Sequence, residues 1–152
     1  MKTENPEEKL SAALRAADVV VAYAPLPDEQ EFVSFLKENG VRTVGVSVLT
    51  DRTTDPNAYA ESLAKRYAEQ KVVLLIPGRA FDASGTRHGR GGGWYDRFLA
   101  TVPRAWLRVG VLSVAEFSKE TLPRESWDEP MDWLLISNGG VWHAQKASAQ
   151  DV

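Results

Sequence analysis

The sequence predicts an α/β domain in which helices cover both faces of a mostly parallel β-sheet. Short apolar runs rich in β-branched residues alternate with segments whose apolar residues recur at helical spacing, an order typical of βαβ units. The runs are apolar throughout, as in strands that are buried on both faces. The length of 152 residues fits one such domain with one core.

The first helix is predicted to begin at Pro6, because Asn5 can cap it and Glu8 completes a capping-box spacing. Four apolar residues then recur at helical spacing: Leu10, Ala13, Leu14 and Ala17. The continuous apolar run Val19–Tyr23 predicts the first strand.

A second helix is expected after the prolines at positions 25 and 27, which break this strand. Asp28 and Glu31 have the spacing of a second capping box, and Gly40 sits where a helix commonly ends. The apolar stripe of this helix consists of Phe32, Phe35 and Leu36. Residues 41–49 follow as the second predicted strand.

The rest of the chain repeats this alternation. Asp55 and Pro56 form a cap-plus-proline start for a third helix, with Tyr59, Leu63 and Tyr67 on one face. A fourth helix is predicted at residues 94–100, and three further strands at Val72–Ile76, 107–112 and 133–136. We expect one domain over residues 1–143 and a polar tail that frays over residues 144–152.

The composition excludes several classes of protein. With 43% hydrophobic and 26% charged residues, the chain is neither disordered nor collagen-like nor a coiled coil. No apolar run approaches the ~20 residues that span a bilayer, and the first residues lack the hydrophobic stretch of a secretory signal. The chain has no cysteine, which excludes disulfides and thiolate metal sites. We therefore expect a cytoplasmic protein without a membrane partner.

The overall charge gives no sign of a nucleic-acid partner. The net charge of −3 comes from 18 basic and 21 acidic residues, whereas non-specific binding of a duplex needs a basic surface. Residues 77–99 differ from the rest, because they hold six of the eleven glycines. Their four arginines (79, 87, 90 and 97) outnumber their two acids, Asp82 and Asp96. This imbalance predicts a local anion site.

The segment 77–99 begins where a predicted buried strand ends, which is where open α/β sheets bind ligands. Glycines at positions 89, 91, 92 and 93 allow close backbone approach and point several N–H groups at one anion. Arg87 and Arg90 offer planar guanidinium groups for phosphate oxygens, and the following helix adds its positive N-terminal end. Asp96 is placed to hold a magnesium ion that bridges the phosphates.

The standard phosphate motifs are absent from this segment. Gly89-x-Gly91-x-x-Trp94 lacks the third glycine of the dinucleotide fingerprint, and no Gly-Lys-Ser/Thr follows. The residues alone therefore leave open a surface loop with solvated arginines.

The order of residues from Pro77, P-G-x-A-F-D-x-x-G-x-R-x-G-x-G-G-G-x-Y-D-R-F-L, resembles the signature of the 5-formyltetrahydrofolate cyclo-ligase (methenyltetrahydrofolate synthetase) family. The resemblance continues in Leu122-Pro123-x-Glu125-x-Trp127-Asp128-x-Pro130-Met131-Asp132 and in Tyr23-x-Pro25-Leu26-x-x-Glu29. It implies a three-layer α/β/α fold, similar to the sugar-phosphate isomerase and CoA-transferase group, over most of the chain.

The resemblance also implies an activity. Members of the family use MgATP to convert 5-formyltetrahydrofolate to 5,10-methenyltetrahydrofolate: ATP phosphorylates the formyl oxygen, N10 attacks the activated carbon, and phosphate leaves. Such chemistry depends on clamping phosphates and neutralising charge more than on a protein nucleophile.

The site residues carried over by position fall into four groups. The ATP-binding loop would comprise Arg87, His88, Gly89, Arg90, Gly91, Gly92, Gly93, Trp94 and Tyr95. The catalytic residues would be Arg87, Tyr95 and Asp96. The magnesium ligands would be Asp96 and Asp128. The reduced folate would contact Glu29, Gly92 and Trp94.

Most of these residues have a purely structural alternative. Asp96 and Glu29 could be charges in the first turn of a helix, and Asp128 could be a turn residue. Trp94 and Tyr95 could anchor the core. His88 could contact phosphate or merely be exposed.

The sequence departs from the family pattern at three places. It begins at what looks like the family's second helix, so the basic residues of a first helix that contact ATP have no clear counterpart. The family's G-I-x-E-P segment is missing, and residues 50–70 look like a loop and a helix instead. Histidine and tryptophan, His88 and Trp127, stand where the family has leucine and histidine. The alternative function is therefore a nucleotide- or phosphate-binding paralogue with a different substrate or no catalysis, and a second copy in a homo-oligomer could complete the pocket.

Overall fold

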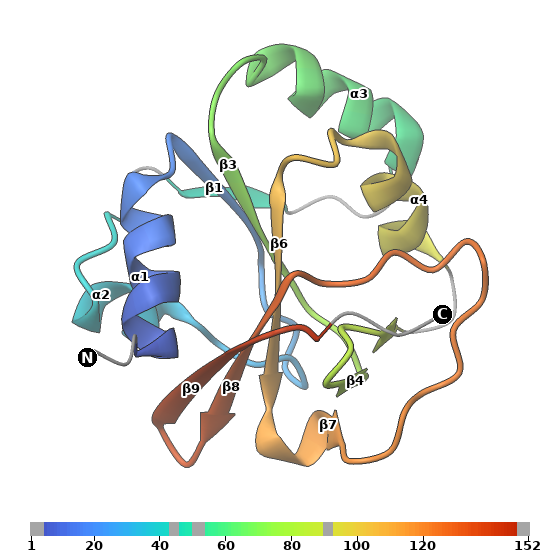
Figure 1. Cartoon of the computed structure of the whole chain (residues 1–152). Coiled ribbons are helices and arrows are strands. Elements are labelled where there is room, and N and C mark those ends of the chain that lie inside the picture. The colour runs from blue at the N-terminus through green and yellow to red at the C-terminus, as the bar shows by residue number, and fades with distance from the viewer. Residues whose placement is uncertain (1–4, 43–45, 50–53, 90–92, 149–152) are drawn as a thin grey trace.

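The computed structural model describes residues 5–42, 46–49, 54–89 and 93–148, which form three layers around a six-stranded sheet (Figure 1). The strand order is β2-β1-β3-β6-β8-β9. These strands are β1 (Val19–Tyr23), β2 (Val46–Leu49), β3 (Val72–Ile76), β6 (Leu107–Ser113), β8 (Trp133–Asn138) and β9 (Val141–Lys146). All neighbours pair in parallel except β9, which is antiparallel to β8. The predicted α/β class with a mostly parallel sheet is confirmed.

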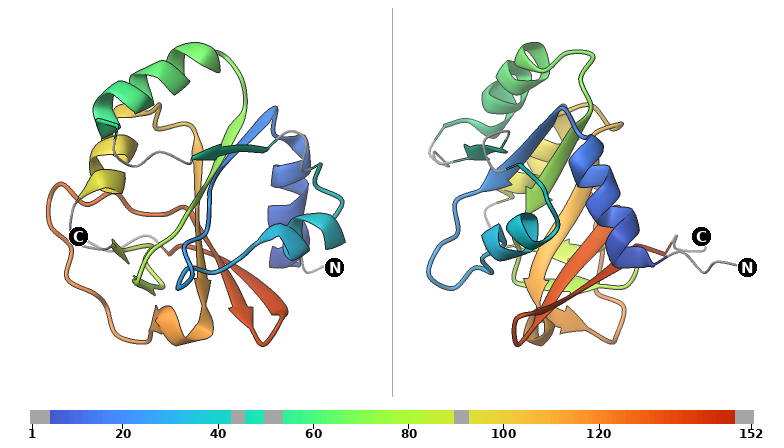
Figure 2. Two further views of the ribbon diagram at one scale, coloured as in Figure 1. Left: turned by 180° about the vertical axis from the view of Figure 1, so that it is seen from behind. Right: turned by 90° about the vertical axis from the view of Figure 1, so that its left-hand side faces the viewer.

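The helices lie on the two faces of this sheet (Figures 1 and 2). One face carries α1 (Pro6–Ala16) and α2 (Val33–Glu38), and the other carries α3 (Pro56–Arg66) and α4 (Trp94–Thr101). Strand β3 shows why both faces need a cover, because Leu74 and Ile76 pack with the α3–α4 side while Val73 and Leu75 pack with the α1–α2 side. Alternate side chains of a strand point to opposite faces, so an all-apolar strand fills two cores.

The predicted helix starts are confirmed for α1 and α3. The Asn5 side chain accepts hydrogen bonds from the backbone N–H groups of Glu7 and Glu8, and Asp55 accepts one from Ala58 N–H. A proline occupies the first turn of both helices, where its missing N–H costs no hydrogen bond. Local capping chemistry was therefore sufficient to locate these two boundaries.

The start of α2 and the extent of β2 were predicted wrongly. Helix α2 begins only at Val33, because the Glu31 carboxylate accepts hydrogen bonds from Val33 N–H and Ser34 N–H and does the capping that we expected of Asp28. Residues 41 and 42 lie outside β2, which begins at Val46, and residues 43–45 are outside the described ranges.

The predicted fraying tail was also wrong in part, because residues 144–146 belong to β9. Ala144 is buried against β8, and Ala147, the first residue after β9, donates its backbone N–H to Asp132 O. Beyond Lys146 the structure continues without regular structure to residue 148.

A second, three-stranded sheet was not predicted. It consists of β4 (Ala80–Asp82), β5 (Arg87–His88) and β7 (Phe117–Ser118), which follows the short 3₁₀ helix Val114–Glu116. The Phe81 ring joins this sheet to the large one: a Cβ on Gly78 or on Gly110 of β6 would lie 2.8 and 2.5 Å, respectively, from its ring atoms. Both glycines are therefore required by the close approach of Phe81.

The order of the large sheet places a topological switch between β1 and β3. The chain passes from β1 to β2 on one side and returns to β3 on the other side of β1. The loops after the carboxyl ends of these two strands consequently diverge and leave a crevice, where ligands of open α/β sheets bind. None of the helices in the described ranges has the length and apolar character needed to cross a membrane.

Candidate active site

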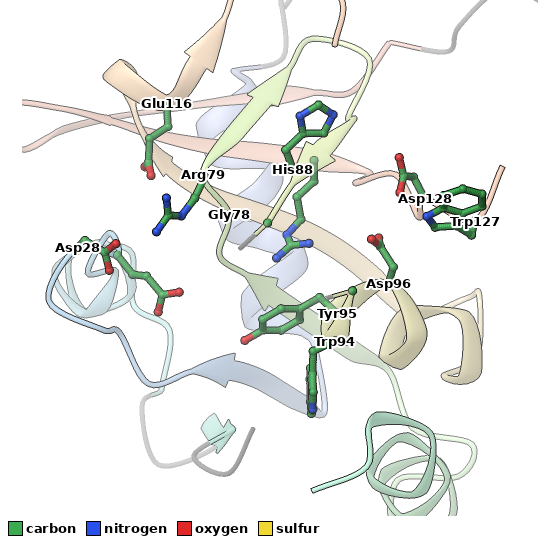
Figure 3. A pocket seen from close by; sticks show the side chains of 14 residues that line it. Asp28, Gly78, Arg79, His88, Trp94, Tyr95, Asp96, Glu116, Trp127 and Asp128 are labelled. Atoms are coloured by element: carbon green, nitrogen blue, oxygen red, sulfur yellow. The ribbon is translucent and has the colours of Figure 1, made fainter. Parts of the chain in front are cut away.

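A cavity of about 500 Å³ opens at the carboxyl ends of β1, β3 and β6 (Figure 3). The loop after β1 contributes Asp28 and Glu29, and the loop after β3 contributes Gly78 and Arg79. The segment after β6 contributes Glu116. The rest of the wall comes from β5 and the residue after it, from the start of α4 and from the segment before β8. The expectation that the crevice lies beyond the ends of parallel strands is therefore met.

Arg87 lines this cavity and is held in place by two contacts. Its residue is only 6% exposed, its Nε donates to Pro77 O, and its guanidinium carbon lies 4.8 Å from the centre of the Tyr95 ring. Cation–π contact and the carbonyl bond together fix the orientation of the group. A Cβ on Gly89 would lie 2.8 Å from Arg87 Nη2, so the backbone of the loop runs directly over the guanidinium. Arg87, Gly89 and Tyr95 thus form one unit.

The glycine-rich segment leads from this unit into α4. Gly93 has a left-handed backbone with φ of +68° and occupies the cap position of α4, a conformation that side chains other than glycine rarely adopt. The N-terminal end of α4 opens into the cavity through Gly93, Trp94 and Tyr95. Three predicted site residues, Arg90, Gly91 and Gly92, lie outside the described residues.

Trp94 lines the cavity but points much of its ring toward α3. Its indole N–H donates to Thr54 O at 3.0 Å, and its ring stacks on Phe98 at a centroid distance of 5.2 Å. Tyr59 packs edge-on against the same ring. Trp94 therefore anchors the α3–α4 layer, as the structural alternative predicted, and presents only part of its ring to a ligand.

The two candidate metal ligands, Asp96 and Asp128, face the same side of the cavity (Figure 3). Asp96 Oδ1 accepts a hydrogen bond from Glu129 N–H at 3.3 Å. Burial is the main cause that raises the pKa of Asp96; the Glu129 N–H and the charge of Arg87 oppose this rise, and the charges of Asp128 and Glu129 add to it. Like charges brought together in this way favour a bound cation.

Asp128 is both a turn residue and a part of the cavity wall. Its Oδ2 accepts a hydrogen bond from Glu125 N–H at 2.8 Å, which closes the turn 125–128. No group of three or more histidine, cysteine or acidic residues with metal-site geometry exists among the described residues. Asp96 and Asp128 are thus the two carboxylates that could hold a magnesium ion here, and carboxylate oxygens are ligands that Mg²⁺ accepts.

The loop after β1 forms the opposite end of the cavity, the acidic end, where Asp28 and Glu29 lie. Glu29 accepts a hydrogen bond from Leu26 N–H at 2.9 Å and stabilises the turn after β1. Since α2 begins only at Val33, the alternative of a first-turn helix charge is wrong for Glu29. The Tyr23 hydroxyl donates to Gln30 O and holds the same loop against the sheet.

Sequence reasoning missed Asp28, Arg79 and Glu116 as cavity residues. Each lies within six residues of the end of a parallel strand, and this position is the signal that could have found them. Glu116 also caps the 3₁₀ helix, because its Oε1 accepts from Ser113 N–H at 2.9 Å. Among the described lining residues, the carboxylates (28, 29, 96, 116 and 128) outnumber the two guanidinium groups, Arg79 and Arg87. A polyanion entering this cavity needs an accompanying cation.

His88 connects the small sheet to the segment that carries Asp128. Its Nε2 lies 2.7 Å from Pro123 O, and its ring is part of the cavity wall. The residue is half-buried rather than simply exposed. It therefore combines a structural bond with access to a ligand.

Comparison with known proteins gives one consistent result. The sequence model of the 5-formyltetrahydrofolate cyclo-ligase family matches residues 2–137. A 5-formyltetrahydrofolate cyclo-ligase of Mycoplasma pneumoniae is 26% identical over 121 residues, which cover 76% of this chain and 71% of that protein. The corresponding protein of Haemophilus influenzae is 38% identical over 65 residues, which cover 42% of this chain and 34% of that protein.

Two solved structures share the fold. The 5,10-methenyltetrahydrofolate synthetase of Mycoplasma pneumoniae superposes with a TM-score of 0.54 at 23% identity and covers 86% of this chain and 80% of its own. The synthetase of Aquifex aeolicus superposes with a TM-score of 0.53 at 22% identity and covers 96% of this chain and 85% of its own. At this level of identity the superpositions support the three-layer architecture alone.

Proposed function

This chain belongs to the 5-formyltetrahydrofolate cyclo-ligase family, and from that premise we propose that it converts 5-formyltetrahydrofolate to 5,10-methenyltetrahydrofolate with consumption of ATP. The observation that carries the proposal is the unit of Arg87, Tyr95 and Gly89, which lies at the start of α4 beside a pair of carboxylates. A buried, fixed guanidinium next to a glycine-rich backbone and a helix N-terminus suits a polyphosphate.

In this proposal the triphosphate of ATP lies over Arg87 and the N-terminal end of α4. The guanidinium is oriented before the ligand arrives, because Tyr95 and Pro77 O hold it. Pre-orientation lowers the entropic cost of binding and keeps the positive charge where charge develops during phosphoryl transfer. Tyr95 thereby acts through Arg87, and the loop 87–95 supplies the ATP contacts expected from the resemblance.

The donor set at Asp96 and Asp128 fits a magnesium ion. Both are hard oxygen ligands, and the surplus of carboxylates among the described lining residues requires a cation beside the phosphates. When bound, magnesium neutralises phosphate charge and orients the triphosphate. The hydrogen bond from Glu129 N–H orients the Asp96 carboxylate on this side of the cavity, and the turn 125–128 orients that of Asp128.

The acidic end suits the reduced folate. The pterin ring presents several N–H donors, and Glu29 and Asp28 offer carboxylate acceptors on the loop after β1. Trp94 adds the exposed part of its ring at the boundary between the two halves of the cavity. Placement of the formyl group between these acids and Arg87 would bring its oxygen toward the phosphates. We place this reaction in the cytoplasm, without a nucleic-acid or membrane partner. A homo-oligomer, in which a second copy completes the pocket, is the assembly to test.

Formation of the product gives the direct test. Mixing the protein with MgATP and 5-formyltetrahydrofolate should produce the absorbance of methenyltetrahydrofolate, and Arg87→Ala should remove most of it. Arg104→Ala, which alters an arginine that does not line the cavity, serves as the control for loss of a positive charge. Binding of ATP without any product at high protein concentration would identify the chain as a nucleotide-binding paralogue instead.

A further inference from the structure

Trp127 stands out among the five tryptophans of the chain, all of which lie in the described ranges. Trp127 is 66% exposed. By contrast, Trp106 and Trp133 are only 5% and 7% exposed, and Trp94 and Trp142 are half-buried. A large indole left open to water usually marks a surface that a ligand or partner covers. The indole of Trp127 borders the cavity described above.

The segment on both sides of Trp127 is firmly held, so the exposed indole is not on a loose loop. On one side, Leu122 N–H donates to Asp82 Oδ2 at 2.7 Å, and His88 Nε2 lies 2.7 Å from Pro123 O. On the other side, Asp128 closes its turn with Glu125.

Glu129 supplies the last anchor of this segment. Its N–H donates to Asp96, and its carboxylate pairs at 3.2 Å with Arg108, which is buried to 1% exposure. The backbone therefore presents the Trp127 ring in a prepared position, at little further cost in entropy when a flat ligand covers it.

The position of Trp127 indicates which flat ligand this is. The ring lies beside Asp128 at the cation side of the cavity, on the opposite side from Asp28 of the acidic end (Figure 3). With the phosphates on Arg87 and the pterin at the acidic end, the group left for the Trp127 end is the base of the nucleotide. Stacking on an indole needs only a π face, and a purine offers a large one.

We propose, on the basis of the proposed function, that Trp127 is the stacking platform for the purine base of the nucleotide. The residue touches the substrate and contributes to affinity, but it takes no part in the phosphoryl transfer. Because the indole contacts only the base, it contributes to the affinity for ATP and not to the affinity for inorganic polyphosphate. Loss of one base–aromatic stack corresponds to a weakening of about tenfold or more.

Calorimetric titration of the full chain with MgATP and with magnesium tripolyphosphate tests this proposal. We expect Trp127→Ala to weaken MgATP binding about tenfold or more and to change tripolyphosphate binding by less than about twofold. Trp127→Phe should retain most of the ATP affinity. Trp142→Phe is the matched control, because Trp142 packs on Phe35 at the opposite face of the sheet and should leave both affinities unchanged.

The outcomes separate this inference from the proposed function. Equal MgATP affinity in the wild type and Trp127→Ala overturns the stacking role, and so does an equal loss for both ligands. A loss of affinity for 5-formyltetrahydrofolate with unchanged ATP affinity also overturns it, by assigning the indole to the folate. A wild-type chain that binds neither polyphosphate contradicts the proposed function itself. Thermal unfolding of both Trp127 variants checks that they remain folded.

Discussion

Two aspartates of the glycine- and arginine-rich segment have opposite surroundings, although the sequence shows them only fourteen residues apart. Asp82 in the small sheet is buried and accepts hydrogen bonds from Ser84 N–H, Ser84 Oγ, Thr86 N–H and Leu122 N–H. Asp96 at the cavity is half-buried, and among the described residues it accepts one N–H, that of Glu129, at 3.3 Å. The first carboxylate is fully used by the fold, and the second retains oxygens for a ligand.

The same contrast is seen in the pKa values. Burial is the largest single influence on the Asp82 carboxyl and by itself would raise its pKa. The hydrogen bonds from Ser84, Leu122 and Thr86 together outweigh burial, so the pKa of Asp82 is lowered. Burial raises the pKa of Asp96, and neighbouring acids add to the rise. A carboxylate whose charge the protein stabilises contributes to folding, whereas one whose charge is poorly stabilised is available to a cation. The pair therefore separates a structural acid from a functional one.

The largest effect is expected for Asp82→Ala. Removing the carboxylate leaves the N–H groups of Thr86, Leu122 and Ser84 without their acceptor, which should lower the free energy of unfolding by about 3 kcal/mol. Urea unfolding followed by circular dichroism measures this loss. Asp82→Asn should lose less, and ATP affinity should persist in both variants under folding conditions. An unchanged free energy of unfolding would remove Asp82 from its structural role.

The next effect concerns Arg87→Ala, which alters the site rather than the fold. Loss of a charge-assisted contact to phosphate should weaken binding of MgATP by about 1.5–3 kcal/mol, measured by calorimetry. Arg104→Ala, which breaks a partly exposed pair with Asp132, should leave ATP affinity unchanged and lower stability by no more than about 1 kcal/mol. Equal ATP affinity in wild type and Arg87→Ala would contradict the phosphate assignment.

Asp96→Asn should show the opposite pattern from Asp82→Asn. We expect ATP affinity to fall about tenfold in the presence of magnesium and much less in EDTA, because an amide is a poorer ligand for Mg²⁺ than a carboxylate. Stability should be retained or rise, since the charge that burial disfavours has been removed. The affinity difference between the two conditions is the measurement, and a loss of equal size in EDTA would exclude the magnesium role.

The smallest effect is the dependence of stability on pH. Because the folded-state pKa of Asp82 is lowered, its contribution is complete above the unfolded value near 3.8 and is lost as the pH falls through the folded value. Because the folded-state pKa of Asp96 is raised, ionised Asp96 opposes folding at neutral pH, and this opposition disappears below its unfolded value. Between pH 6 and 3, Asp82→Asn should thus flatten the decline of stability and Asp96→Asn should steepen it. Identical slopes in both variants would contradict the assignment.

Much of the fold could be predicted because hydrophobic pattern and capping are local properties. The apolar runs of β1 and β3 and the caps Asn5 and Asp55 were enough to find their elements. The small sheet was not predictable, since its strands have only two or three residues and are held by contacts with distant segments, such as the hydrogen bond from Leu122 N–H to Asp82. Strand β9 was not predicted because it is a half-exposed edge strand whose six residues, VWHAQK, contain as many polar as apolar side chains.

The site was predictable only along one segment. Arg87, Tyr95 and Asp96 lie together because strand, glycine-rich loop and helix follow one another in the sequence. Their position relative to Glu29 and Asp128 depends on sheet order and on the bonds of the segment 122–129, which no local pattern specifies. For Glu116 and Arg79 the sequence offers one signal, their position shortly after the end of a parallel strand, but it does not specify which side chains there face the cavity.

The ring of Phe81 restricts movement of the cavity wall that carries Arg87 and His88. It packs tightly against Gly78 in the loop after β3 and against Gly110 within β6, so the small sheet cannot tilt without displacing that loop and β6. The wall that carries Arg87 and His88 is thus as stiff as the core behind it. A bound nucleotide would meet a fixed surface on this side, and any adjustment of the protein to different ligands would have to come from side chains at the rim rather than from movement of the wall.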